Sequence, residues 1–139
     1  MSELDVTTQE YRDLPSIPNG RYGHGCAVVT VNDRRYLVVA GGTLVFPVAR
    51  ATAGTDILDL VDETWVSGGE MSQVRTMTQM VVVNDRVVVL GGQGEDSSPV
   101  DTVEELDMEN WTWSLVDVRM KQPRSGFEAV VIPKKMVSP

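Results

Sequence analysis

The segment from Met80 to Gly92 reads MVVVNDRVVVLGG and is the most regular part of the sequence. Two valine-rich runs are separated by Asn84-Asp85 and closed by a glycine doublet. Short β-branched runs bounded by turn residues are typical of β-strands, and Asn and Asp tolerate the left-handed backbone of a tight hairpin. The stretch therefore predicts a β-hairpin. Its valines do not alternate with polar residues, so we expect both faces of the strands to be buried.

The same pattern occurs earlier in the chain, where Cys26 to Val31, Asn32-Asp33 and Tyr36 to Gly42 follow one another. Other markers repeat in a fixed order. An apolar-Asp-apolar triplet begins at Leu4, Leu58 and Leu106, with spacings of 54 and 48 residues. Seven residues after each leucine comes an aromatic residue, and an arginine follows ten or eleven residues later. These aromatic and arginine markers are Tyr11, Trp65, Trp113, Arg21, Arg75 and Arg124.

An ordered repeat of this length indicates stacked structural units. Each unit offers four short antiparallel strands, named a to d, and no window has the periodicity of an amphipathic helix. One four-stranded sheet cannot cover both of its own faces, whereas sheets stacked around an axis can. The sequence therefore predicts an all-β fold, a partial β-propeller with two complete blades and parts of two others. The expected units are residues 1–20 (strands c and d of a preceding blade), 21–74 and 75–123 (full blades), and 124–139 (the first strand of a next blade).

These markers resemble the kelch repeat, in which a glycine doublet closes the second strand and an arginine leads into the next first strand. The doublets here are Gly41-Gly42 and Gly91-Gly92, and the resemblance covers almost the whole chain. We expect Trp65 and Trp113 to fill the wedge between adjacent blades, with Tyr11 as a smaller filler. The arginines are expected to hydrogen-bond carbonyl groups in neighbouring turns. Kelch propellers close with about six blades, so either this is a piece of a larger protein or copies associate to complete a ring.

Composition narrows the class of partner. The net charge of −8 argues against nucleic acid and against an anionic membrane surface. No apolar run approaches the length of a membrane-spanning helix, and the first residues do not resemble a signal peptide. With Cys26 as the single cysteine, a cytoplasmic location is the expectation.

Catalytic and metal-binding groups are sparse. His24 is the single histidine, and one histidine with one cysteine is a poor set of metal ligands. We expect His24 to be a packed, hydrogen-bonded blade residue and Cys26 a small core side chain. The acidic residues from Glu95 to Glu105 lack the spacing of a calcium loop and are expected on a solvated rim. The sequence therefore predicts no enzyme activity, no catalytic residue, no metal and no cofactor.

Function in a propeller is expected in the loops. The b–c loop from Thr43 to Gly54 carries apolar residues, which we expect to tuck back onto the blade, with a contact surface as the alternative. In kelch adaptors of ubiquitin ligases, the b–c and d–a loops grip partner peptides. The resemblance extends this role here to the second b–c loop (93–100) and to the d–a loops at 67–74 and 117–123. Candidate partner-binding residues are Phe46, Arg50, Glu70, Glu95, Asp96, Arg119 and Lys121.

The resemblance thus implies a protein-binding module, plausible as the substrate-recognition part of a cullin ubiquitin ligase. Three alternatives stay open at this point. One is a kelch protein that binds actin, a second is a fragment of a kelch-type sugar-processing enzyme, and a third is a truncated product without function.

Overall fold

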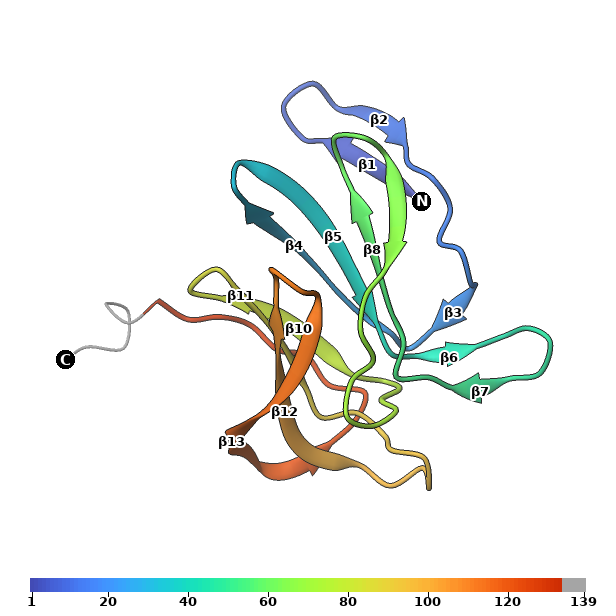
Figure 1. The fold of residues 1–139 in the computed structure, drawn as a ribbon, viewed down its shortest axis with the longest axis vertical. Coiled ribbons are helices and arrows are strands. Elements are labelled where there is room, and N and C mark those ends of the chain that lie inside the picture. Colours follow the sequence, from blue (N-terminus) through green and yellow to red (C-terminus); the bar gives the residue numbers. More distant parts are fainter. Residues whose placement is uncertain (134–139) are drawn as a thin grey trace.

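The computed structural model describes residues 1–133, and that range contains β-strands and connections but no helix. Two antiparallel four-stranded sheets form its body (Figure 1). Blade 1 has the strand order β4 (Gly25–Val31), β5 (Arg34–Ala40), β8 (Thr55–Asp59), β9 (Thr64–Ser67). Blade 2 has the order β10 (Gln79–Val83), β11 (Arg86–Leu90), β12 (Val100–Asp107), β13 (Thr112–Arg124). The predicted all-β partial propeller is confirmed.

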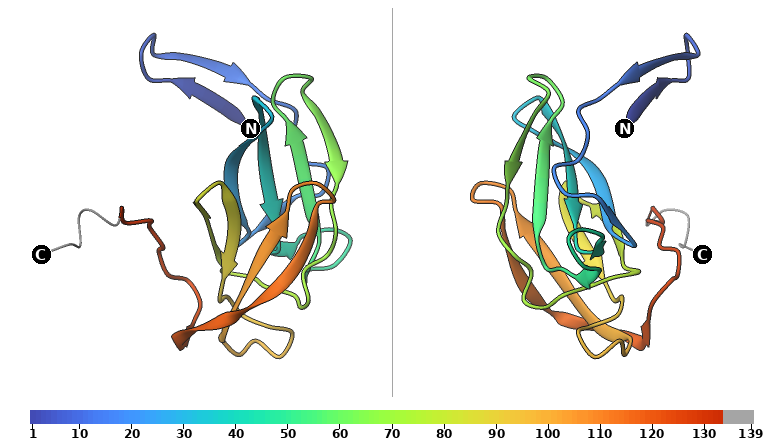
Figure 2. Two further views of the ribbon diagram at one scale, coloured as in Figure 1. Left: turned by 60° about the vertical axis from the view of Figure 1, so that its left-hand side comes forward. Right: turned by 90° about the vertical axis from the view of Figure 1, so that its right-hand side faces the viewer.

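Two smaller sheets complete the fold. The hairpin of β1 (Ser2–Asp5) and β2 (Glu10–Asp13) stands beside blade 1 near the N-terminus (Figure 2). Exposed ion pairs join it to blade 1, from Arg12 to Glu63 at 2.8 Å and from Arg35 to Glu3 at 3.6 Å. The other small sheet has the order β3 (Arg21–Tyr22), β6 (Thr43–Leu44), β7 (Arg50–Ala51). The predicted b–c loop of blade 1 is therefore a short hairpin of its own.

The a–b hairpins turn where the sequence predicts. Val31 pairs with Arg34, and Val83 pairs with Arg86, so each loop has two residues. All four loop residues have positive φ between 50° and 65°, at Asn32, Asp33, Asn84 and Asp85. Two successive left-handed residues match the twist of the flanking strands, which is why short Asx side chains occupy these positions.

The c–d turns explain the leucine-aspartate triplet. The Asp59 carboxylate accepts hydrogen bonds from the main-chain N–H groups of Val61 (2.8 Å) and Asp62 (3.1 Å), and those of Asp5 and Asp107 bond the following turn in a similar way. The leucine before each aspartate is the cross-strand partner of the aromatic marker. These pairs are Leu4 with Tyr11, Leu58 with Trp65, and Leu106 with Trp113. The spacing of seven residues therefore measures one tight hairpin.

The main core lies between the two blades. Its buried apolar side chains come from the facing sides of both sheets and from the connection between them. They are Val29, Val38, Ala40, Ile57, Met71, Met80, Val87, Val89 and Leu106. The opposite side of blade 2 is only half-buried at Val81 and Val88, so the expectation that both faces of these strands are buried is met on one face. The second face lacks a full sheet packed against it within the described residues.

Two expectations at the C-terminal side are wrong. Residues 117–123 were expected to form a loop but belong to β13, which continues to pair with β12 through Arg119 and Arg124 despite register shifts. The first strand of a next blade, expected within 124–139, is not formed between the end of β13 at Arg124 and Pro133; in both complete blades strand a pairs with a strand b, and no described strand pairs with this segment. The rest of that expectation, at 134–139, lies outside the described residues. Across the described range, no helix could span a membrane.

Candidate partner-binding surface and its scaffold

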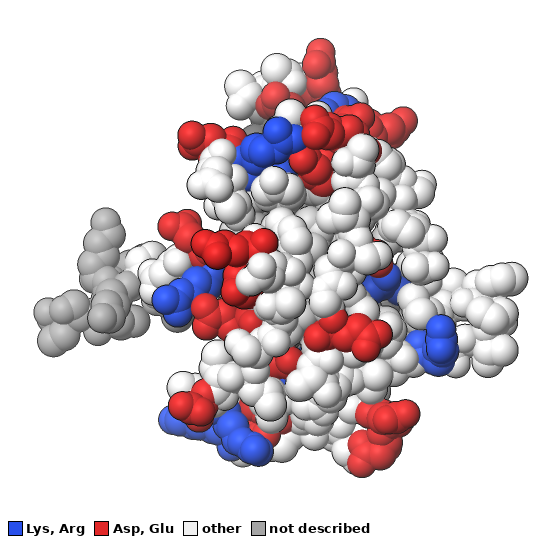
Figure 3. All heavy atoms as spheres, in the orientation of Figure 1, with Lys and Arg blue, Asp and Glu red and all other residues white. Residues whose placement is uncertain are grey.

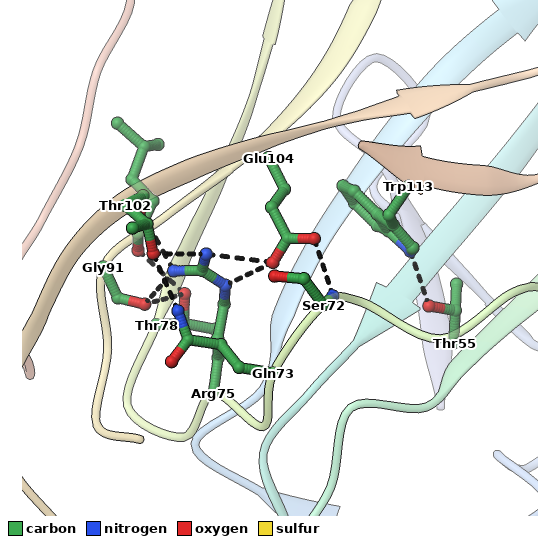
Figure 4. Close-up of polar contacts among 10 residues, drawn as sticks. Thr55, Ser72, Gln73, Arg75, Thr78, Gly91, Thr102, Glu104 and Trp113 are labelled. Carbon is green, nitrogen blue, oxygen red and sulfur yellow. Dashed lines mark hydrogen bonds and ion pairs between the residues drawn. The ribbon is translucent and has the colours of Figure 1, made fainter. Parts of the chain in front are cut away.

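Arg75 holds blade 2 together from inside. Its side chain and that of Glu104 are both 0% exposed, and their charged groups lie 2.9 Å apart. The guanidinium also donates to the main-chain oxygens of Gly91 (2.9 Å) and Thr102 (3.0 Å), while the second Glu104 oxygen accepts from Ser72 N–H (2.8 Å; Figure 4). Burial lowers the pKa of Arg75 against the opposing effect of Glu104. Since every buried charge has a partner, the arrangement is a structural clamp.

Arg21 occupies the same place in blade 1. It forms an almost wholly buried ion pair with Asp56 and donates to the main-chain oxygens of Gly41 (3.2 Å), Gly54 (3.4 Å) and Asn19 (3.4 Å). The arginine markers at 21 and 75 therefore contact carbonyl groups of the turns around them.

The main chain of the arginine binds the preceding blade. Gly42 N–H donates to Arg75 O (2.6 Å), and Gly92 N–H donates to Arg124 O (2.7 Å). Gly41 and Gly91 have φ of 71° and 57°, and an added Cβ at either would collide with the carbonyl oxygen of the next arginine. Glycine is required here both for the backbone conformation and for this close approach.

The carboxylates that pair with the arginines were missed from sequence. Asp56 and Glu104 each lie three residues before the aspartate of the c–d turn, so their equivalence was visible in the repeat. Ser2 stands at the matching position of the first unit, which hid the pattern. Glu104 was expected on a solvated rim and is instead fully buried. Because Glu104 stands next to Glu105 and near Asp101, its sequence neighbours do not indicate that it is buried beside an arginine.

The aromatic markers differ in burial. The Trp113 indole N–H of blade 2 donates to Thr55 Oγ1 of blade 1 at 2.8 Å, and Trp65 donates to Pro15 O at 3.3 Å. Both side chains are partly buried, and Trp113 packs against the core between the blades. Tyr11 is 73% exposed, so its expected role as a filler is wrong. A second inter-blade aromatic contact, unexpected from sequence, joins Tyr36 to Trp111 edge to face at 5.2 Å.

The b–c hairpin of blade 1 is the most exposed apolar feature near the loops. Phe46 is 84% exposed and Val48 71%, and Val45 is also exposed. The expectation that these residues tuck back onto the blade is wrong, because pairing of β6 with β3 and β7 directs the tip away from the sheet (Figure 1). In the space-filling view, the tip projects as an uncharged surface at the right-hand edge (Figure 3).

A cavity of about 210 Å³ lies at the base of this hairpin. Three connections meet there: the segment before β3, the b–c hairpin, and the segment after β9. The lining residues that matter chemically are Arg21, Leu44, Asp56, Ser67 and Glu70. We name the hairpin tip together with this cavity the loop surface.

The second b–c connection is tied to the first. Gln93 and Thr76 exchange two main-chain hydrogen bonds, and the Thr76 hydroxyl bonds that of Thr43 in β6 at 2.8 Å. Glu95 and Asp96 are exposed beyond Gln93. The structure therefore places Glu95 and Asp96 on the connection that adjoins the base of the β6–β7 hairpin.

The remaining candidates are three basic residues, of which Arg50 belongs to the β6–β7 hairpin and the other two to blade 2. Arg50 is exposed in β7, while Arg119 lies on strand β13 and is paired with Asp101 at 3.1 Å. Lys121 is exposed on β13. Both of these basic residues were expected on a loop.

Two expectations about reactive side chains fail. Cys26 is exposed on β4 and is not a core residue. The Nδ1 atom of His24 is buried without a hydrogen-bond partner, and burial lowers the pKa of His24, with a smaller effect from Arg21. Within residues 1–133, no three His, Cys, Asp or Glu side chains gather where they could hold a metal ion.

Comparison with known proteins agrees with this geometry. The family model of the Kelch motif matches residues 75–117. An F-box/kelch-repeat protein of Arabidopsis thaliana is 29% identical over 133 residues, which cover 96% of this chain and 35% of the relative. Kelch-like protein 33 of Homo sapiens is 29% identical over 109 residues (78% and 20%), and alpha-scruin of Limulus polyphemus is 31% identical over 80 residues (58% and 9%).

The solved structure of YjhT superposes with a TM-score of 0.73 at 14% identity, covering 84% of this chain and 44% of that one. At that identity the likeness concerns the fold alone. Four-stranded blades, glycine doublets and arginine clamps in one order define a kelch-type propeller. The chain carries a Kelch motif and is similar to kelch-repeat proteins, and it spans about a third or less of the length of the three relatives named above.

Proposed function

We propose that the chain is a non-catalytic protein-interaction module that binds partner proteins through its loop surface. The observation that carries the proposal is the exposed apolar tip of the β6–β7 hairpin, where Phe46 is 84% exposed. Aromatic side chains, phenylalanine among them, are enriched in protein interfaces relative to the rest of the protein surface. Glu70 and Arg50, exposed near the hairpin base, supply polar contacts around it.

The particular form that we propose is recognition of substrates for a cullin ubiquitin ligase. It rests on the resemblance to kelch adaptors, and F-box and kelch-like proteins are among the relatives. The relatives also include alpha-scruin, so the cytoskeletal role is the competing outcome of the same experiment.

The test is quantitative affinity purification from cell extract with the wild-type chain and a variant carrying F46A, R50A and E70A. We expect the recovery of partners that bind the loop surface to fall by at least about tenfold. A tenfold change corresponds to about 1.4 kcal/mol of binding free energy. A matched control carries V61A and E109A, which alter exposed residues of the c–d turns.

If the triple alanine variant retains every partner of the wild-type chain, the proposal is wrong. Recovery of cullin subunits with the wild-type chain supports the ligase form, whereas recovery of actin supports the cytoskeletal one. A glycan-processing activity in the purified chain would contradict a non-catalytic module.

A further inference from the structure

From the loop surface we infer the chemistry of the partner: a peptide segment with an apolar side chain beside a lysine or arginine. The apolar side chain packs on the tip at Phe46, and the basic side chain enters the cavity at the hairpin base. This inference rests on the proposed function and specifies its ligand.

The cavity favours a cation for two reasons, and the first concerns Arg21. Its guanidinium lines the cavity, yet its N–H groups already donate to Asp56 and to the main-chain oxygens of Asn19, Gly41 and Gly54. An incoming anion would find few free donors on this arginine. The charge of Arg21 is also cancelled by Asp56.

The second reason is the charge that remains. Glu70 lines the same cavity, is exposed, and forms no ion pair within the described residues. Glu70 therefore adds one uncompensated negative charge to the residues that line the cavity, and the exposed Arg50 of β7 is not among those residues. A lysine or arginine placed there gains a charge-assisted hydrogen bond, and the Ser67 hydroxyl on the cavity wall offers a further acceptor.

The cavity and the apolar tip are adjacent in the fold. Leu44 lines the cavity and leads directly into Val45 and Phe46, and Val45 N–H is fixed to Gly20 O at 3.2 Å. One short segment can therefore place an apolar and a basic side chain at both points. The net charge of −8 adds a long-range attraction for a basic partner.

The experiment is selection of a random 12-residue peptide library on the full immobilised chain, followed by affinity measurement with the enriched peptides. We expect enrichment of peptides that carry Lys or Arg within a few positions of Phe, Leu or Trp. E70K should lower the affinity for these peptides by at least about tenfold, and F46A should lower it by a similar factor. E109K makes the same charge change in the c–d turn of blade 2 and should leave the affinity unchanged.

The outcomes separate this inference from the proposed function. Enrichment of acidic peptides, or of peptides that respond to F46A but not to E70K, overturns the basic partner and keeps the loop surface as a binding site. Failure to enrich any peptide that responds to F46A or E70K overturns both. Circular dichroism of each variant shows that a lost interaction is not a lost fold, since Phe46 and Glu70 are exposed.

Discussion

Replacement of Glu104 by glutamine is expected to lower the free energy of unfolding by about 3–5 kcal/mol, the range for breaking a buried ion pair from one side. Glu104 accepts from Arg75 Nε at 3.0 Å with one oxygen and from Ser72 N–H at 2.8 Å with the other. Glutamine keeps the volume but has a single oxygen, so its amide N–H₂ must face one of these donors. A buried guanidinium then loses its counter-charge.

Urea unfolding followed by tryptophan fluorescence measures the effect. With a urea slope of about 1–3 kcal/mol per M, the midpoint should fall by at least about 1 M. A second variant that replaces both Arg75 and Glu104 by methionine removes the unpaired charge. It should still be less stable than the wild type, because the carbonyl groups of Gly91 and Thr102 lose their donor.

The control is R119A, which breaks the exposed ion pair with Asp101 and should scarcely move the midpoint. D56N, in the equivalent clamp of blade 1, should resemble E104Q. A midpoint for E104Q that matches that of R119A would show that the clamp does not hold the blade, and the reasoning would be refuted.

Three further expectations follow from the scaffold. W113F should lose about 1 kcal/mol of stability with the bond to Thr55, and a double-mutant cycle with T55V shows whether the two losses are coupled. G91A should lose about 2 kcal/mol or more in thermal unfolding, because its φ is 57° and a Cβ would lie 2.7 Å from Arg124 O; an unchanged melting temperature would contradict this. His24 should titrate below the ordinary value of about 6.5 by NMR. Since the unfolded chain then takes up the proton first, stability should fall as the pH drops below about 6.5, and H24Q should remove that part of the pH dependence.

The parts of the fold that sequence predicted are those set by local chemistry. Asn84-Asp85 predicted a two-residue hairpin because few residues accept positive φ at both positions. The glycine doublets and the leucine-to-aromatic spacing were also predictive, because each is set by the backbone of a single turn. Stacking of blades followed from the repeat, because no unit can bury its own faces.

The errors concern burial and long-range pairing. Tyr11 was expected to be a smaller filler between blades and is 73% exposed, because burial depends on which sheet packs against a residue, and that information is not local. The length of β13 is set by pairing with β12 across register shifts, so Asp117–Pro123 read as a loop. The partner of Arg75 lies 29 residues away, and the sequence marks it only by position within the repeat.

Each marker arginine contacts two successive blades, and this limits how such a protein can gain or lose repeats. Its carbonyl oxygen serves the doublet of one blade and its guanidinium serves the doublet of the next, as Arg75 does between Gly42 and Gly91. A duplicated or transplanted block with ends in the c–d turns carries each arginine together with the carboxylate that neutralises it. A block cut between an arginine and the following doublet would instead pair the arginine with the carboxylate of another unit, which can differ in length, as Asp56 and Glu104 do. Recombination within repeats of this kind should therefore preserve folding when the crossovers fall in the c–d turns.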